Sequence, residues 1–163
     1  APLDWLGKLV CQPQPAGRVP LGRLRTLVGG GAHGFLLGGN LATLCALVGT
    51  PYLPPTAGAI LCIEDTAEHA YRIDRMVCQL HQAGVLKHVL GVVVGSLAGC
   101  KPAGRARYAA RSVLERAVAS LGVPAVSGAD FGHQPRNLAW PQGVLARLDA
   151  SRGRLTILEP AVC

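Results

Sequence analysis

The sequence has few aromatic residues and few charged ones. Aromatic side chains make up 4% and charged side chains 15% of its 163 residues, whereas hydrophobic residues reach 50%. This composition excludes a disordered acidic or basic tail, because such tails are rich in charge and poor in apolar residues. The length suits one domain with a substantial core, which must consist mainly of Leu, Val, Ala and Ile.

An uninterrupted hydrophobic run of membrane-spanning length is also missing. Residues 26–63 contain no formally charged side chain, but glycines, prolines and Asn40 interrupt them. Such interruptions predict short elements rather than one lipid-facing helix. The first residues likewise lack the basic start and apolar centre of a signal peptide. We therefore expect no contact with a membrane.

The cysteines lack the Cys-x-x-Cys spacing of zinc sites. Six are present, and three of them, Cys45, Cys62 and Cys78, lie within apolar runs, where a free thiol behaves as a small buried hydrophobe. The sequence therefore predicts neither a disulfide framework nor a bound metal, and it has no His-Glu-x-x-His pattern of a metalloprotease. Free cysteines fit a reducing, cytoplasmic location.

The net charge is +7, carried by 13 arginines and only 3 lysines. A basic chain raises the question of nucleic-acid binding. The densest basic group is Lys101, Arg105, Arg107 and Arg111, but only Tyr108 is interleaved with it, and no known nucleic-acid-binding signature accompanies it. We interpret the group as a solvated helix face and expect no nucleic-acid partner.

Hydrophobic periodicity predicts a mixed α/β domain with about five or six strands and about three helices. Strands are expected at residues 24–28, 59–63, 89–94, 123–126, 143–149 and 154–159. Helices are expected at residues 41–48, between a Thr66 cap and Gly84, and at residues 107–121, the first of them capped by Asn40. The glycine-rich residues 29–34 are expected to form a loop, and residues 1–20, which contain four prolines, to be irregular.

The loop sequence Gly29-x-Gly31-x-x-Gly34 matches a dinucleotide-binding pattern. In that pattern a helix begins within the glycine run, so that its N-terminus meets the pyrophosphate. Here the helix is expected only after Asn40, and the acidic pair Glu64-Asp65 comes later than a ribose-binding acid usually does. A dinucleotide-binding domain therefore remains a weaker alternative.

Glu64 and His133 are the strongest candidates for chemistry. Glu64 follows the apolar run Ala-Ile-Leu-Cys-Ile, and His133 follows Gly132, which lets the backbone approach a partner closely. A carboxylate that orients an imidazole forms part of a Ser-His-acid triad. From spacing alone, however, a His and a Glu 69 residues apart are more often surface groups or partners in a structural hydrogen bond.

No serine is convincing as the nucleophile of such a triad. The serines are residues 96, 112, 120, 127 and 151, and none lies in a Gly-x-Ser-x-Gly elbow. Ser96 and Ser127 follow expected strands but lack the sharp strand-to-helix turn that exposes a reactive hydroxyl. The cysteines that could replace serine are expected to be buried.

Several sequence blocks resemble the C-terminal half of the LD-carboxypeptidases, the murein tetrapeptide carboxypeptidases, with the microcin-immunity peptidases as relatives. The resemblance covers about residues 24–159, with all blocks in the same order. The blocks are Gly34-x-x-x-Gly38-Gly39-Asn40-Leu41, Gly49-Thr50-Pro51, residues 60–65, residues 71–76, Gln79-Leu80-x-x-Ala83-Gly84, residues 91–95 and Phe131-Gly132-His133.

The resemblance implies a swivelling β/β/α-type domain that supplies Glu64 and His133 to a Ser-His-Glu triad. The serine of the family lies in an N-terminal flavodoxin-like domain that these residues do not contain. The implied reaction releases the terminal D-alanine of a murein tetrapeptide during cytoplasmic cell-wall recycling, without a metal or organic cofactor. Gly38, Gly39 and Asn40 are then expected either to line the substrate cleft or only to fix the backbone there.

The resemblance also implies a domain division. Residues 1–20 are expected to be a linker or the remnant of the missing nucleophile domain, and residues 21–163 the LD-carboxypeptidase C-terminal domain. A non-catalytic module that binds peptides or a partner chain is the alternative function. The sequence leaves open whether the protein is a homodimer and whether its substrate is a peptidyl-nucleotide toxin. It also leaves open whether Arg72 and Arg75 bind substrate, contact another subunit or pair with acids on their own helix.

Overall fold

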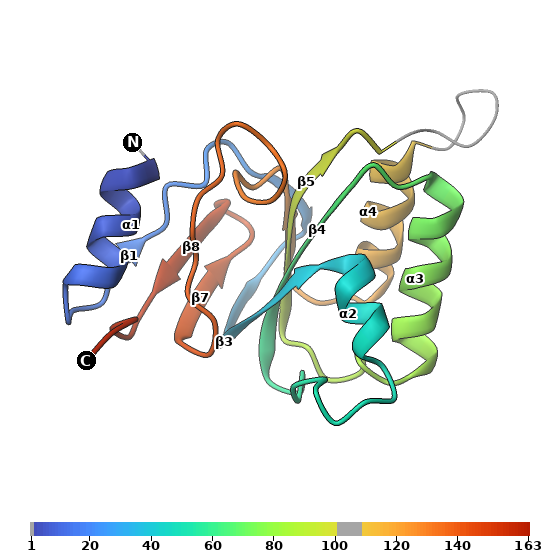
Figure 1. Cartoon of the computed structure of the whole chain (residues 1–163), viewed down its shortest axis with the longest axis horizontal. Coiled ribbons are helices and arrows are strands. Elements are labelled where there is room, and N and C mark those ends of the chain that lie inside the picture. The colour runs from blue at the N-terminus through green and yellow to red at the C-terminus, as the bar shows by residue number, and fades with distance from the viewer. Residues whose placement is uncertain (1, 101–108) are drawn as a thin grey trace.

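The computed structural model describes residues 2–100 and 109–163. Within these residues it contains one mixed sheet of eight strands and four helices, so the α/β class is confirmed (Figure 1). The helices are α1 (Pro2–Cys11), α2 (Leu41–Leu47), α3 (Ala70–Gln82) and α4 (Ala110–Ser120). The strands are β1 (Gly17–Arg18), β2 (Arg25–Val28), β3 (Gly31–Asn40), β4 (Ala59–Thr66), β5 (Gly91–Ala98), β6 (Ala125–Ser127), β7 (Leu145–Asp149) and β8 (Arg154–Ile157).

The sheet combines a parallel half with an antiparallel half. The strand order is β1-β8-β7-β3-β4-β5-β6-β2, in which β3, β4, β5 and β6 are parallel and the remaining pairs are antiparallel. Helices α2, α3 and α4 lie beside the parallel strands, whereas α1 lies at the opposite end of the molecule (Figure 1). Parallel strands carry functional groups where their carboxyl ends meet, so the ends of β3, β4 and β6 are the natural place for a site.

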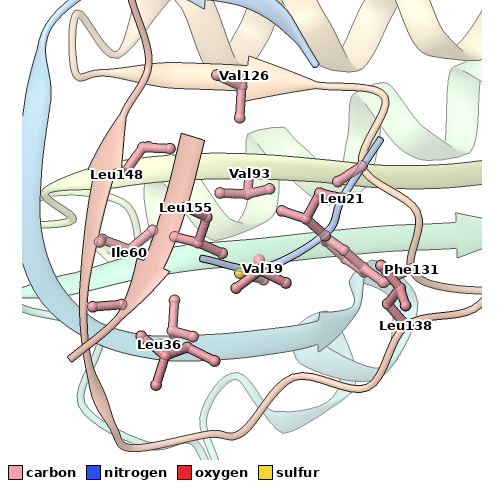
Figure 2. Packing of buried hydrophobic residues seen from close by; sticks show 14 of the residues in the cluster. Val19, Leu21, Leu36, Ile60, Val93, Val126, Phe131, Leu138, Leu148 and Leu155 are labelled. Atoms are coloured by element: carbon pink, nitrogen blue, oxygen red, sulfur yellow. The ribbon is translucent and has the colours of Figure 1, made fainter. Parts of the chain in front are cut away.

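Two hydrophobic clusters pack on opposite faces of the sheet. Alternation along β4 sends Ile60 and Cys62 into one cluster and Leu61 and Ile63 into the other. The second cluster, which contains Leu61 and Ile63, lies beneath α2, α3 and α4. The first, which contains Ile60 and Cys62, also takes in buried residues of α1. Leu21 and Phe131 belong to this first cluster (Figure 2). Both faces of β4 are therefore shielded from water, which explains its continuous apolar sequence.

The first twenty residues are more ordered than expected. Residues 2–11 form helix α1, in which Trp5 and Leu9 are buried, and residues 17 and 18 form strand β1. The prolines misled the prediction, because Pro2 occupies the first helical position, where a missing N–H costs nothing, and Pro13 follows the helix end. These residues also supply Ala16 and Val19 to the first cluster, so they pack against the rest of the chain.

The expected loop at residues 29–34 is mostly strand. Strand β3 begins at Gly31 and continues through the glycines to Asn40. Glycine is required here because the backbone just before β4 approaches β3 closely: a Cβ on Gly34 would lie 2.3 Å from the Gly58 carbonyl oxygen. Since no helix begins in this glycine run, the dinucleotide-binding alternative loses its structural basis.

Several other boundaries differ from the prediction. Strand β4 does not end at Ile63 but includes the acidic pair and ends at Thr66. Helix α3 is capped at His69 rather than at Thr66, and α2 ends at Leu47, before the expected Gly49 stop. The predicted cap of α2 is confirmed, since the Asn40 side chain accepts a hydrogen bond from Thr43 N.

The structure bears only in part on the expectations about nucleic-acid and membrane contacts. Lys101, Arg105, Arg107 and the expected start of the last helix lie outside the described residues. Across the described ranges, none of the helices combines the length and the apolar character that crossing a membrane requires.

The cysteines differ in exposure, which corrects one prediction. All six are free; Cys45 and Cys62 are buried as expected, but Cys78 is exposed. The reason is helical geometry, because Cys78 follows the buried Val77 on α3 and is rotated by one residue away from its apolar stripe.

Thiol labelling of the folded chain should follow this exposure. We expect iodoacetamide at pH 8 to modify Cys11, Cys78 and Cys163 rapidly and to spare Cys62 and Cys45, because burial raises the pKa of the Cys62 thiol and raises that of Cys45 to about 11. Mass spectrometry of tryptic peptides measures the labelling, with the urea-unfolded chain as control. Equal labelling of Cys62 and Cys78 in the folded chain would contradict the packing described here.

Candidate active site

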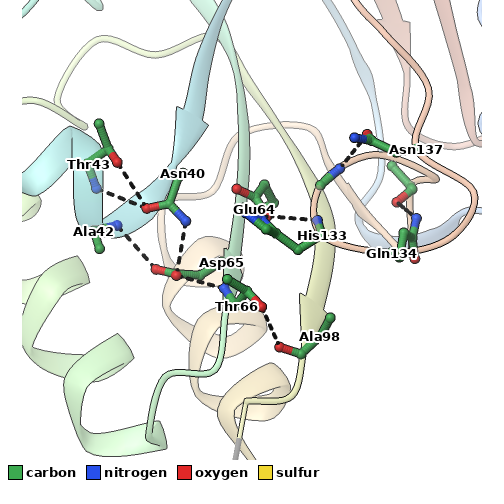
Figure 3. A network of polar contacts seen from close by, with 12 residues as sticks. Asn40, Ala42, Thr43, Glu64, Asp65, Thr66, Ala98, His133, Gln134 and Asn137 are labelled. Atoms are coloured by element: carbon green, nitrogen blue, oxygen red, sulfur yellow. Dashed lines mark hydrogen bonds and ion pairs between the residues drawn. The ribbon is translucent and has the colours of Figure 1, made fainter.

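Glu64 and His133 meet where the carboxyl end of β4 reaches the loop that follows β6. Alternation along β4 directs Glu64 to the face that carries Cys62, whereas Asp65 faces α2. The loop after β6 passes over the first of these faces, where the Phe131 ring packs in the first cluster. The two side chains are 69 residues apart in the sequence and lie side by side in Figure 3.

Both N–H groups of His133 point at one carboxylate oxygen. Its Nδ1 lies 2.8 Å from Oε2 of Glu64, and its backbone N donates to the same oxygen at 3.3 Å. Because a carboxylate accepts, Nδ1 carries the proton, and Nε2 is left as the basic nitrogen of the neutral ring. The Glu64 side chain is 7% exposed and that of His133 is 57% exposed, so the acid is fixed inside the protein and the imidazole faces outward.

The close approach depends on Gly132. Its φ is +99°, and a Cβ at this position would lie 2.6 Å from the Glu64 Oε2 atom and 2.8 Å from its Cβ. A side chain would therefore push the loop away from the carboxylate. The sequence prediction that Gly132 permits close contact is confirmed.

The carboxylate changes the basicity of the imidazole. The hydrogen bond and the charge of Glu64 raise the pKa of His133 above its ordinary value, with a smaller contribution from Asp65. Asp65 itself is buried, and desolvation raises its pKa although it accepts hydrogen bonds from Thr66 N, Asn40 Nδ2 and Ala42 N. The two neighbouring acids thus have different contacts: Glu64 binds the His133 side chain, and Asp65 binds the start of α2.

A hollow of about 260 Å³ lies at the exposed side of His133. Its lining includes one of the three predicted substrate-binding residues, Gly39. Gly38 instead packs against the carbonyl of Cys62, and the Asn40 side chain both caps α2 and donates to Asp65 at 3.1 Å. The other lining residues are Glu64, Phe131, Gly132, His133, Asn137 and Trp140.

Sequence reasoning missed Asn137 and Trp140. Trp140 packs edge to face against Phe131, and the neighbouring Ala139 carbonyl accepts a hydrogen bond from Trp5 Nε1 at 2.8 Å. Helix α1 therefore helps to hold the loop that carries His133. The only signal in the sequence that could have identified Asn137 is its position four residues after His133.

The hollow contains no nucleophile of its own. No serine, threonine or cysteine is among its lining residues. Ser127 donates to Glu115 and Ser120 to the Ala117 carbonyl, so these hydroxyls are engaged elsewhere. Across residues 2–100 and 109–163, no three His, Cys, Asp or Glu side chains are grouped closely enough to bind a metal ion.

Other charged side chains lie apart from this pair. Arg72 pairs with Glu68 at 3.5 Å, so its partner is a nearby acid, although Glu68 lies just before α3 and not on the helix. A larger hollow at the beginning of β3 is lined by Arg147, Arg152 and Arg154, whose exposed guanidinium groups are screened by solvent. Such a basic, uncovered sheet face is an ordinary solvated surface.

The chain is thus a mixed α/β domain with an acid–histidine pair at the carboxyl end of its parallel strands. Residues 33–148 match the family model described as the LD-carboxypeptidase C-terminal domain. The chain belongs to this family.

Two named relatives and one solved structure show the extent of the similarity. The chain is 47% identical over 138 residues to a Streptomyces coelicolor protein that bears the name carboxypeptidase, covering 84% of the chain and 43% of the relative. It is 33% identical to the murein tetrapeptide carboxypeptidase of Pseudomonas aeruginosa, covering 75% and 40% respectively. The muramoyltetrapeptide carboxypeptidase of Oxalobacter formigenes matches with a TM-score of 0.75 at 28% identity over 95% of this chain and 53% of that one. The chain thus spans less than half the length of both named relatives.

Proposed function

We propose that this chain is the Glu- and His-bearing domain of a serine-type LD-carboxypeptidase. The observation that carries the proposal is the 2.8 Å contact between His133 Nδ1 and the buried Glu64 carboxylate, with Nε2 left free at an exposed hollow. This is the arrangement in which an acid fixes the tautomer of a general base. The names of the relatives, murein tetrapeptide and muramoyltetrapeptide carboxypeptidase, support a murein peptide as substrate.

The reaction needs a serine from a second domain. His133 Nε2 removes the proton of that serine hydroxyl while its oxygen attacks the carbonyl carbon of the L,D peptide bond. The protonated imidazole, stabilised by Glu64, then gives the proton to the leaving amine of D-alanine. A water molecule hydrolyses the acyl-serine by the same two proton transfers, and the serine is regenerated. Gly39 contributes open backbone at the hollow where the peptide is bound, and Gly38 and Asn40 hold this end of β3 in place.

A non-catalytic peptide-binding module is the second candidate. The absence of a nucleophile from the lining of the hollow favours it. Such a module would bind murein peptides at the same place without cleaving them. The cell-wall recycling role, the cytoplasmic location and a homodimeric assembly belong to the first proposal as further expectations.

Release of D-alanine separates the two candidates. We expect the whole protein, with its serine-bearing domain, to release D-alanine from a murein tetrapeptide, and the 163-residue chain alone to release none above background. Chromatography of the products with time measures the release. Binding without cleavage by the whole protein would establish the module, and normal turnover by the chain alone would refute a nucleophile supplied by another domain.

A further inference from the structure

The loop that carries His133 directs two hydrogen-bond donors of this residue at one oxygen of Glu64. The backbone N–H and the Nδ1 group of His133 both reach Oε2 of Glu64, at 3.3 Å and 2.8 Å. These two contacts can coexist only if the peptide between Gly132 and His133 keeps its orientation. That orientation depends on the positive φ of Gly132, a conformation that glycine adopts readily but does not enforce.

A side chain further along the loop restrains this glycine. The Gly132 N–H donates to Oδ1 of Asn137 at 3.0 Å, which closes the segment between them into a ring (Figure 3). Asn137 is exposed and lines the hollow beside His133. Its contact fixes the plane of the peptide immediately before Gly132 Cα, on the opposite side of that atom from the peptide that meets Glu64.

Backbone hydrogen bonds also restrain this loop. The Ser96 N–H donates to the Phe131 carbonyl at 2.9 Å, on the same peptide as the Gly132 N–H. The Leu138 N–H donates to the Asp130 carbonyl at 2.7 Å, and Arg136 pairs with the Asp130 carboxylate at 2.9 Å. Gln134 donates through its backbone N to the Gly132 carbonyl and through its side chain to the Ala129 carbonyl. These contacts hold carbonyl groups and the ends of the loop, whereas the Asn137 side chain is the acceptor for the Gly132 N–H.

We propose that Asn137 is a positioning residue of the active site, which acts through Gly132 to hold His133 on Glu64. The proposal rests on the proposed function for its catalytic meaning, although the restraint itself is a property of this chain. Loss of the Oδ1 acceptor leaves the peptide between Phe131 and Gly132 held only through its carbonyl, which accepts from Ser96 N at 2.9 Å. The Gly132 N–H side of that peptide is then less restrained, and the imidazole samples positions away from the carboxylate. Displacement of a general base by about 1 Å is enough to cost on the order of a hundredfold in rate.

Three variants test this role. Asn137→Ala removes the acceptor, Asn137→Asp keeps an oxygen at the same place, and Gln134→Ala is the control, because it removes a side-chain hydrogen bond elsewhere on the same loop. Thermal melting should show all three folded, since residue 137 is exposed. NMR titration of the His133 ring in the 163-residue chain then measures its pKa, which is raised mainly by the contact with Glu64.

We expect the pKa of His133 to fall toward its ordinary value in Asn137→Ala, to stay raised in Asn137→Asp and to be unchanged in Gln134→Ala. In the whole enzyme, Asn137→Ala should lower kcat about 10- to 100-fold with KM changed less than about threefold, and Asn137→Asp should recover most of the loss. An unchanged pKa in folded Asn137→Ala, or a change in KM alone, would overturn the proposal. If the whole protein proves inactive but the pKa shifts as described, the restraint stands and the proposed function fails.

Discussion

Replacing Glu64 with glutamine is expected to lower kcat of the whole enzyme by about 10³- to 10⁴-fold, the scale seen when the acid of a Ser-His-acid triad is made neutral. The amide has nearly the shape of the carboxylate but no charge, and its NH₂ group can bind His133 Nδ1 as a donor. Such a contact places the ring proton on Nε2, so the nitrogen that faces the hollow can no longer accept a proton. The imidazolium formed during the reaction also loses its counter-charge.

The pH dependence gives this prediction a second readout. Glu64 raises the pKa of His133, and a base must lose its proton to act, so the rate of the wild-type enzyme should rise with pH through that raised value. In Glu64→Gln the remaining activity should also rise with pH, but with its midpoint at a lower pH than in the wild type, because the carboxylate that raises the pKa of His133 has been removed. Glu159→Gln, which changes a carboxylate that contacts Leu145 instead, is the matched control. Wild-type turnover in Glu64→Gln would remove Glu64 from the mechanism.

The largest expected loss of stability follows from Gly38→Ala. Its Cβ would lie 1.9 Å from the carbonyl oxygen of Cys62, which is backbone of the central strand β4 and cannot turn aside. The φ of +138° is also unfavourable for alanine. Overpacking and backbone strain together should lower the free energy of unfolding by about 4 kcal/mol or more.

Gly122→Ala is the matched control for this substitution. Gly122 also has a positive φ, +70°, but a Cβ there would have no atom within 4 Å. Only the conformational strain remains, so the expected loss is about 1 kcal/mol. Urea unfolding of the 163-residue chain, followed by circular dichroism, measures both values. Similar losses in the two variants would show that β3 and β4 are not as close at Gly38 as the structure places them.

Local signals predicted the elements that depend on neighbours in the sequence. The Asn40 cap requires only the residues of one helical turn, and the β7–β8 hairpin is marked by the turn sequence Ser151-Arg152-Gly153. The buried stripe of α3, with Ile73 and Leu80, follows from helical spacing. These predictions are confirmed because the physics that decides them acts over a few residues.

Long-range packing decided the elements that were predicted wrongly. The glycines of β3 read as a loop, because nothing near them reveals that the backbone of β4 passes within contact distance. Helix α1 read as irregular, since its stability comes from burying Trp5 and Leu9 on a cluster formed by residues far along the chain. Asn137 and Trp140 carry no motif, and only the folded loop places them at the hollow.

Composition and periodicity were enough to predict an apolar, lightly charged α/β domain. One apolar run and one Phe-Gly-His block identified Glu64 and His133 as candidates. Their roles in catalysis remain predictions. Only folding brings the two groups to 2.8 Å, buries the acid, leaves the imidazole exposed and places Gly132 and Asn137 beside the contact. The reason is physical: composition and periodicity report what a chain can bury, whereas a hydrogen bond between residues 69 positions apart exists only after two faces of a sheet and a returning loop have been packed together.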